Sequence, residues 1–339
     1  MSRDITFTGY SQYSSLAPSG LGNPGNLCYL NSLLQTFASS DHWTNFFKKY
    51  SSIHPLIPEL SSIIEQLRQS FNDKNIIATK KLRNQLAKAG LSVSITTQQD
   101  FHEFYIKLLD LLESLFKQST TANFCAFATK RIFPSSCIYE ETIKCSSCGN
   151  LIFSINQTSF IILDVGQSTL TNALNNYFGK NIIRSRCSKC GEINNRIMTR
   201  KIVFLPKSIL FFINRRQYAE SLRPSLVPFE YPLSFSMRDY SMIRKDYEPK
   251  DDNFLKISLT GISETIQNSH NEYKLTSVVA FQGADNRGHY YSYRIHKDNK
   301  PPYPQRWFCT NDKKITPVSL DCALSQTSNV VLLHYEIKL

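Results

Sequence analysis

The cysteines of this chain fall into two groups that could do different chemistry. Nine are present, at positions 28, 125, 137, 145, 148, 187, 190, 309 and 322. Cys28 follows a short turn and precedes residues with the apolar spacing of a helix. The N–H groups and the dipole at a helix N-terminus favour a thiolate, which is the nucleophilic form of cysteine. Cys28 is therefore a candidate nucleophile, although a cysteine at a helix start is more often a small buried residue.

The turn before Cys28 carries residues that suit an anion-stabilising site. Asn23 could donate its side-chain amide to a developing oxyanion. Gly22 and Gly25 let the backbone turn sharply and approach a reacting carbonyl closely. These residues predict a donor beside the candidate nucleophile.

A cysteine nucleophile also needs a base, and the base needs a group that fixes its tautomer. His289 is the best candidate of seven histidines, because Gly288 precedes it and a strand-like run follows at 290–295. The other six lie in contexts typical of surface or structural histidines: His42, His54, His102, His270, His296 and His334.

The second group of cysteines forms two C-x-x-C pairs, each followed by glycine: Cys145 with Cys148, and Cys187 with Cys190. Two intervening residues let both sulfurs of a pair face one ion, and the glycine lets the turn fold back so that backbone N–H groups reach the sulfurs. Four such thiolates suit tetrahedral zinc in a closed, structural site. A redox dithiol and four cysteines without metal are the alternatives.

Apolar spacing predicts helices from about residue 20 to about residue 118. The apolar residues at 30, 33, 34 and 37 share one helix face, and those at 101, 104, 105, 108, 109, 112 and 115 share another. Thr97 is placed to cap the second helix. Asp100 and Glu103 fall in its first turn, where the helix dipole favours carboxylates. A polar break at 119–123 ends this helical part.

From about residue 131, short runs rich in β-branched and aromatic residues predict strands. Examples are the runs at 202–205, 209–213, 273–281, 290–295 and 330–337. Prolines at 224, 228 and 232, and three more within 297–305, predict surface loops. Helices first, followed by strands that hold the C-x-x-C pairs, predict an α+β fold.

Composition limits the class of protein. The 339 residues, 41% hydrophobic and 19% charged, allow a large packed core in one long domain or in two. No stretch reaches the roughly 18 apolar residues of a membrane span. The net charge of +12 is spread along the chain, so a nucleic-acid partner is not expected. The polar N-terminus and the odd number of cysteines favour a soluble protein in a reducing compartment, cytoplasmic or nuclear.

Four segments resemble, in order, motifs of the ubiquitin-specific protease family of papain-like cysteine deubiquitinases. Residues 20–35, GLGNPGNLCYLNSLLQ, resemble its cysteine box, G-L-x-N-x-G-N-T-C-Y-x-N-S-x-L-Q, with Leu27 in place of threonine. Residues 98–104, QQDFHEF, resemble its Q-Q-D-x-x-E-F segment. Residues 205–215 are similar to its L-P-x-x-L strand, although Arg216 replaces the usual phenylalanine. Residues 288–291, GHYY, with Trp307 and the pair at 311–312, resemble its histidine box.

The resemblance implies a thiol-dependent deubiquitinase that hydrolyses the isopeptide bond at the C-terminal glycine of ubiquitin. It implies one catalytic domain at 20–339 after a loose segment at 1–19. Within that domain we expect a helical thumb at about 20–125, β fingers at about 130–205 and a β-rich palm at about 205–339. The four cysteines of the C-x-x-C pairs would bind one structural zinc ion at the tip of the fingers.

The resemblance also assigns roles to individual residues. Asn311 would orient His289 by accepting a hydrogen bond from the imidazole Nδ1–H, with Asp312 as a supporting or substitute partner; a plain Asn-Asp turn is the alternative. The carboxylates of Asp100 and Glu103 would pair with arginines in the ubiquitin tail. The expected catalytic residues are Cys28, His289, Asn311, Asn23 and Asp312, and the expected substrate-binding residues are Gln98, Asp100, Glu103, Gly288 and Tyr290.

The expected partners are ubiquitin and ubiquitinated proteins, without a membrane. Two other functions stay open at this stage: a thiol peptidase for another ubiquitin-like modifier, and a non-catalytic zinc-ribbon protein that binds a modifier or nucleic acid. A non-catalytic protein would be free to lose the four residues that suit catalysis, yet all four are present: Cys28, His289, Asn23 and Asn311. Linkage preference, oligomeric state and the need for an activating protein partner are left open.

Overall fold

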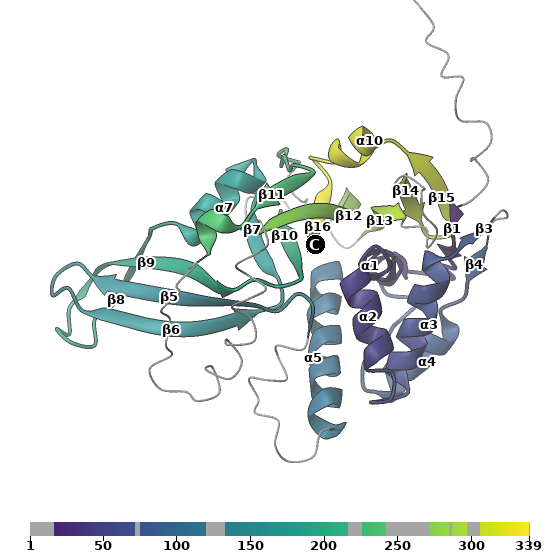
Figure 1. Cartoon of the computed structure of the whole chain (residues 1–339), viewed down its shortest axis with the longest axis horizontal. Helices are drawn as coiled ribbons and strands as arrows, with labels where there is room; N and C mark the ends of the chain where they lie inside the picture. Colours follow the sequence, from purple (N-terminus) through teal and green to yellow (C-terminus); the bar gives the residue numbers. More distant parts are fainter. Residues whose placement is uncertain are drawn as a thin grey trace, which may run out of the picture. The chain divides into compact units, whose positions relative to one another are not determined.

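The computed structural model of the chain (Figure 1) describes residues 17–71, 75–119, 133–215, 226–241, 271–284, 287–296 and 306–338. The chain forms two compact units. The first consists of Met1–Leu111 and His289–Ala323, and the second of Leu112–Gly288 and Leu324–Leu339. Cys28 and His289 therefore belong to the first unit, and both C-x-x-C pairs belong to the second.

Helix α1 (Cys28–Ala38) is the central helix of the first unit. All 11 of its residues are buried, and α2 (Asp41–Lys49) and α3 (Leu56–Arg68) pack beside it. α4 (Lys80–Lys88) packs on α3, and α5 (Phe101–Ser119) begins in this unit. The ring of Phe37 lies 4.6 Å from Trp43 and 5.4 Å from Phe47, measured between centroids. The polar residues Asn31, Ser32, Gln35 and Thr36 of α1 are buried together with its apolar ones. Cys28 at the N-terminus of the helix is held in place by this packing.

The histidine-box residues lie on two neighbouring strands, β13 (Arg287–His296) and β14 (Arg306–Asn311), and in the turn between β14 and β15 (Lys314–Val318). These three strands pair antiparallel with their sequence neighbours. The segment before Cys28 contacts the turn between β14 and β15, because Leu21 N donates to Asp312 O at 2.9 Å. A Cβ atom at Gly20 would lie only 2.8 Å from Lys313 O. Glycine at position 20 therefore allows the two segments to approach each other.

Short strands complete the first unit. β1 (Ala17–Pro18) pairs antiparallel with β3 (Ser70–Phe71), and β2 (Gly20–Leu21) pairs in parallel with β4 (Ile76–Ile77). Arg68 at the end of α3 is within 2.5 Å of Asp41 at the start of α2. These contacts join the strands and helices around the turn that leads into α1.

The second unit contains a four-stranded antiparallel sheet in the order β6-β5-β9-β8. Its strands are β5 (Cys137–Cys145), β6 (Leu151–Thr158), β8 (Asn181–Arg186) and β9 (Ile193–Phe204). One hairpin joins β5 to β6, and another joins β8 to β9. Each C-x-x-C pair occupies one of these two hairpin turns. Because Cys145 on β5 pairs with Arg196 on β9, both turns lie at the same end of the sheet.

A second set of strands follows in the same unit, in the order β12-β16-β10-β7. They are β7 (Ile161–Asp164), β10 (Ser208–Asn214), β12 (Glu272–Ala284) and β16 (Val330–Ile337), with β11 (Ser234–Ser236) on the edge of β12. Only β7 and β10 pair in parallel among the described strands of this set. The described short helices of this unit are η1 (Val165–Gln167), α7 (Leu170–Phe178) and η2 (Arg238–Tyr240), whereas α10 (Leu320–Leu324) begins in the first unit.

The predicted α+β class is confirmed, and each predicted strand run falls on an observed strand except at Leu205, which follows the end of β9. The predicted cap of α5 is wrong. That helix begins at Phe101, and Asp100 caps it by accepting a hydrogen bond from Glu103 N at 3.0 Å. Thr97 lies three residues further back, in the preceding loop. Several predictions fall outside the described residues: most of the loose segment at 1–19, the break at 120–123, the loops around Pro224 and at 297–305, and statements on Cys125, Arg216 and His270.

Candidate active site

Cys28 is the first residue of α1 and is buried, with 3% of its surface exposed. None of the eight cysteines that the structure describes is in a disulfide. Asn23 shapes the turn that leads into the helix, because its Oδ1 accepts from Gly25 N and from Leu27 N, both at 3.1 Å. The backbone N–H groups before the helix are thereby paired locally, and the thiol lies at the positive end of the α1 dipole.

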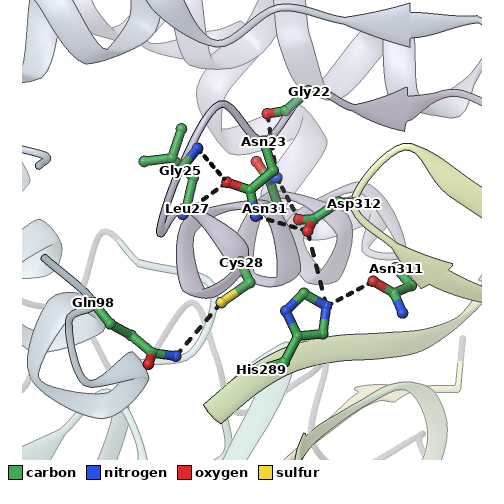
Figure 2. A network of polar contacts seen from close by, with 10 residues as sticks. All are labelled: Gly22, Asn23, Gly25, Leu27, Cys28, Asn31, Gln98, His289, Asn311 and Asp312. Atoms are coloured by element: carbon green, nitrogen blue, oxygen red, sulfur yellow. Dashed lines mark hydrogen bonds and ion pairs between the residues drawn. The ribbon is translucent and has the colours of Figure 1, made fainter. Parts of the chain in front are cut away.

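Asp312 accepts hydrogen bonds from two asparagines of the cysteine-box segment. Its Oδ2 accepts from Asn23 Nδ2, and its Oδ1 accepts from Asn31 Nδ2, both at 2.7 Å. Figure 2 shows the carboxylate between these two amides and the ring of His289. Asp312 has a left-handed backbone with φ of 51°, which an aspartate in a tight turn tolerates. The predicted supporting residue of the histidine therefore also fixes the turn and the first helical turn around Cys28.

His289 contacts Asn311, the residue that the sequence predicted as its orienting partner. Its Nε2 lies 2.7 Å from Asn311 Oδ1 and 3.8 Å from Asp312 Oδ2. The expected atom was wrong, since Nε2 and not Nδ1 contacts Asn311. Figure 2 shows Nδ1 on the side of Cys28. Hydrogen bonding to Cys28 and to Asn311 raises the pKa of His289 to about 9, against the opposing effect of its partial burial. The imidazolium form is therefore favoured beside the sulfur.

Gln98 lies in the loop before α5, and its Nε2 is 3.7 Å from Cys28 Sγ. Asp100, Glu103 and Tyr290, which were also predicted to bind substrate, contact residues other than Cys28. Asp100 caps α5, and the largely exposed Glu103 pairs with Lys107 at 2.7 Å. Tyr290 is buried, and its hydroxyl accepts from Phe101 N at 3.4 Å. Of these residues, Gln98 is the one for which the structure gives a direct contact with the candidate nucleophile.

Gly288 leads into His289, and its lack of a side chain has a packing reason. A Cβ atom there would lie 2.1 Å from the Phe281 ring. Any larger residue would have to displace that ring or move the backbone of the strand that carries His289. Gly288 therefore fixes the path of the chain immediately before the histidine.

Asn31 was not predicted as a site residue, although it stands in the cysteine-box segment. Its position three residues after Cys28, one helical turn along α1, was the available signal. In the structure Asn31 Nδ2 donates to Asp312 Oδ1 and also to Gly22 O, the latter at 3.4 Å. It fastens the N-terminal turn of α1 to the turn that carries Asp312.

The two C-x-x-C pairs form one cluster of four sulfurs. All four Sγ atoms lie within 4.8 Å of one another, with 4.0 Å between Cys145 and Cys190 and 3.7 Å between Cys148 and Cys187. Tetrahedral zinc–thiolate geometry places sulfurs about 3.8 Å apart. The cluster therefore fits a metal ion.

The two hairpin turns have the same backbone design. Gly149 N donates to Cys145 O at 3.0 Å, and Gly191 N donates to Cys187 O at 2.9 Å. Both glycines have positive φ, 69° and 74°, which glycine adopts without strain. The backbone N–H of Cys148, with the side chain of Asn194, lowers the pKa of Cys145 to about 6. The backbone N–H groups of the C-x-x-C turn thus favour the thiolate, which is the form of cysteine that a metal binds.

No helix in the described part of the chain is long and apolar enough to cross a membrane. The described groups can supply a thiol nucleophile, an oriented imidazole and amide donors within a single unit. That combination is suited to acyl transfer from an amide or ester to sulfur and then to water.

Solved structures with the same fold were found. The chain superposes on a SAGA DUB module of Ubp8, Sgf11, Sus1 and Sgf73 bound to monoubiquitin, with a TM-score of 0.69 and 18% identity, covering 95% of this chain and 69% of that chain. A second, described as the SAGA Ubp8/Sgf11/Sus1/Sgf73 DUB module bound to ubiquitin aldehyde, has a TM-score of 0.69, 19% identity and coverage of 95% and 70%. The mixed α+β fold is thus like that of Ubp8, and in this chain it carries a four-cysteine cluster.

Similar sequences agree with this fold. The chain is 22% identical over 327 residues to the probable ubiquitin carboxyl-terminal hydrolase 8 of Schizosaccharomyces pombe and 23% identical over 366 residues to ubiquitin carboxyl-terminal hydrolase 22 of Homo sapiens. Each match covers 93% of this chain, which spans 64% and 65% of the length of those two relatives. Residues 19–335 match the family described as ubiquitin carboxyl-terminal hydrolase. Since this match runs over nearly the whole sequence, the chain belongs to the ubiquitin carboxyl-terminal hydrolase family.

Proposed function

We propose that this chain is a cysteine-type deubiquitinase that hydrolyses the isopeptide bond at the C-terminal glycine of ubiquitin. The observation that carries the proposal is the arrangement around Cys28: a buried thiol at a helix N-terminus, hydrogen-bonded to His289, whose Nε2 contacts Asn311 Oδ1 at 2.7 Å. Cys28 is the nucleophile, His289 is the acid and base, and Asn311 orients the ring.

The reaction has two stages that use the same residues. The Cys28 thiolate attacks the glycine carbonyl carbon, a C–S bond forms, and the carbonyl oxygen takes the negative charge. Collapse breaks the C–N bond, and Nδ1–H of His289 protonates the departing lysine amine. Water then attacks the thioester, His289 accepts the proton from that water, and the C–S bond breaks to release the ubiquitin carboxylate. One water is consumed in each cycle.

Asn23 is proposed as a donor to the oxyanion. An amide nitrogen carries two hydrogens, so its contact with Asp312 uses one and is compatible with this role. The carboxylate of Asp312 would hold the amide in one orientation, as its 2.7 Å distance to Asn23 Nδ2 supports. A donor fixed in advance costs no reorganisation when the oxyanion forms.

The substrate tail is proposed to contact Gln98, Asp100, Glu103, Gly288 and Tyr290. Glu103 is the most accessible carboxylate of this set, with 63% of its side chain exposed, and it can exchange Lys107 for an arginine of the tail. Asp100 can accept from an arginine while its Oδ1 caps α5. Gly288 and Tyr290 would line the path to Cys28 on either side of His289 in the sequence.

One face of the β6-β5-β9-β8 sheet carries exposed large apolar side chains next to exposed charged ones such as Lys144 and Arg184. Ile182 pairs with Ile197, which pairs with Lys144, which in turn pairs with Leu151, so these side chains lie in one row on one face. All the exposed large apolar residues of this sheet share that face: Leu151, Phe153, Ile182, Ile193 and Ile197. Exposed large apolar side chains grouped on one face are typical of protein interaction sites. This grouping supports a folded protein, such as ubiquitin, as substrate.

Zinc is proposed as the metal of the four-cysteine cluster, bound by Cys145, Cys148, Cys187 and Cys190. Bound there, it would supply structural cross-linking and no chemistry at Cys28. The Ubp8 structures contain Sgf11, Sus1 and Sgf73. We propose by analogy that this chain also acts with an activating protein partner, and that it is nuclear or cytoplasmic.

The test is reaction with ubiquitin that carries a C-terminal electrophile, followed by mass spectrometry of the adduct. We expect one ubiquitin per chain, attached to Cys28, and complete loss of labelling in Cys28→Ser. Cys309→Ser is the matched control, because Cys309 is a described thiol in the same unit, and it should label normally. Labelling that persists in Cys28→Ser would overturn the assignment. Reaction only with a probe built on another ubiquitin-like modifier would move the substrate class.

A further inference from the structure

Gln98 contacts the sulfur of Cys28 from a different element than His289 does. Its Nε2 lies 3.7 Å from Sγ, within the range of an N–H···S hydrogen bond. Figure 2 shows the amide nitrogen directed at the sulfur from the loop before α5, while His289 reaches the sulfur from β13. A thiolate is stabilised by each donor directed at it.

The loop that carries Gln98 is docked against the turn before Cys28. Ile95 O accepts from Asn26 N at 2.9 Å and from Asn26 Nδ2 at 3.3 Å. A Cβ atom at Gly25 would lie 2.0 Å from Ile95 O, so glycine is required for this approach. The position of Gln98 is therefore fixed by backbone contacts with the same turn that fixes the nucleophile.

The loop is also ordered within itself. Ser94 Oγ accepts from the backbone N–H groups of residues 96 and 97, both at 3.1 Å, and Gln99 Nε2 donates to Ser92 O at 3.3 Å. These bonds hold the backbone on both sides of Gln98. A side chain on a loop held in this way can present its amide in a defined direction.

We propose that Gln98 is a catalytic residue whose amide N–H stabilises the Cys28 thiolate and then donates to the oxyanion. The second part rests on the proposed function. When Sγ adds to the carbonyl carbon, the oxygen that takes the charge lies two bonds from the sulfur. A donor that contacts the sulfur in the free enzyme therefore needs only a small shift to contact that oxygen. Gln98 gains no bond and loses no proton in this step.

The experiment compares Gln98→Leu, which removes the amide, and Gln98→Asn, which keeps an amide but shortens its reach, with wild type. Cleavage of a fluorogenic C-terminal ubiquitin amide gives kcat and KM. We expect kcat to fall about 100-fold in Gln98→Leu with KM changed less than about threefold, as for loss of one oxyanion donor. Gln98→Asn should recover part of that loss. Gln66→Leu is the matched control, since its amide donates to Ser62 Oγ within α3, and it should change kcat little.

A second measurement does not depend on ubiquitin. Alkylation of Cys28 by iodoacetamide at neutral pH, followed by peptide mass spectrometry, should be several-fold slower in Gln98→Leu, and melting curves confirm that each variant is folded. Unchanged alkylation and kcat would overturn the proposal. A raised KM with unchanged kcat would also overturn it, because Gln98 would then only bind substrate. If wild type does not cleave the ubiquitin amide, the proposed function fails, and the alkylation rates alone decide whether Gln98 acts on the sulfur.

Discussion

The two cysteine sites of this protein are built in different ways. The four-cysteine cluster comes from two hairpin turns of the same design, each with its own C-x-x-C pair and a glycine of positive φ. The Cys28 site is assembled from three segments far apart in the sequence: the turn and start of α1, the loop at Gln98, and the strands that carry His289 and Asn311. Asp312 joins two of these segments by accepting from Asn23 and Asn31.

This difference shows what each site depends on. The four-cysteine cluster needs two local turns brought to the same end of one sheet. The Cys28 site needs the packing of α1, the course of β13 and β14, and close approaches at Gly20 and Gly25. Substitutions should therefore impair the Cys28 site by breaking hydrogen bonds between segments. They should impair the four-cysteine cluster by removing one of its sulfur ligands.

The largest effect in this comparison is expected at Asn311. Asn311→Ala removes the acceptor 2.7 Å from His289 Nε2 and should lower kcat about 100-fold with little change in the affinity for ubiquitin. Asn311→Asp should retain activity, because a carboxylate accepts the same hydrogen bond. Steady-state kinetics and a binding titration with the Cys28→Ala protein separate the two quantities.

Asp312→Ala is the companion variant. It should cost less than Asn311→Ala, because Asp312 lies 3.8 Å from His289 Nε2 and makes its close contacts with two asparagine amides. If Asp312→Ala were inactive and Asn311→Ala near wild type, the orienting position would belong to Asp312.

An intermediate effect is expected from pH. Contacts with Cys28 and Asn311 raise the pKa of His289 to about 9 from an ordinary value of 6.5. A raised pKa means that the protonated ring is favoured in the folded protein, so its stabilising contribution is complete below about pH 6.5 and is lost as the pH rises through about 9. We expect kcat/KM to fall about tenfold per pH unit above 9. In Asn311→Asp, which adds a negative charge, the fall should move to higher pH. A profile that is flat to pH 10 would contradict the protonated histidine.

The smallest effect on kcat is expected from substitutions in the four-cysteine cluster. Cys187→Ser removes one of four ligands, and we expect loss of one bound zinc per chain and a melting temperature lower by at least about 5 °C. The iodoacetamide reactivity of Cys28 should stay near wild type, because no cluster residue lies in the unit that holds Cys28. Metal analysis, a melting curve and the alkylation rate test this. Cys322→Ser is the control, since Cys322 is a described cysteine outside the cluster.

The sequence by itself determined what depends on local pattern. The apolar spacing after Cys28 predicted α1, the two C-x-x-C-Gly turns predicted a four-sulfur cluster, and the order of helices and then strands predicted the α+β class. These features come from backbone preferences and side-chain periodicity within a few residues, so they can be inferred without knowing the fold.

The tertiary structure decided the contacts between distant segments. The sequence placed Asn311 beside the histidine only by resemblance and assigned the wrong ring nitrogen, because the orientation of the ring is set by the path of β13 past Phe281 and by the position of Cys28. It gave no role to Asn31, and it could not show that Gln98 contacts the sulfur. The contacts of Asn31 and Gln98 join residues 281 and 70 positions apart. Their geometry is fixed by the packing of whole elements, and a pattern read over neighbouring residues carries no information on it.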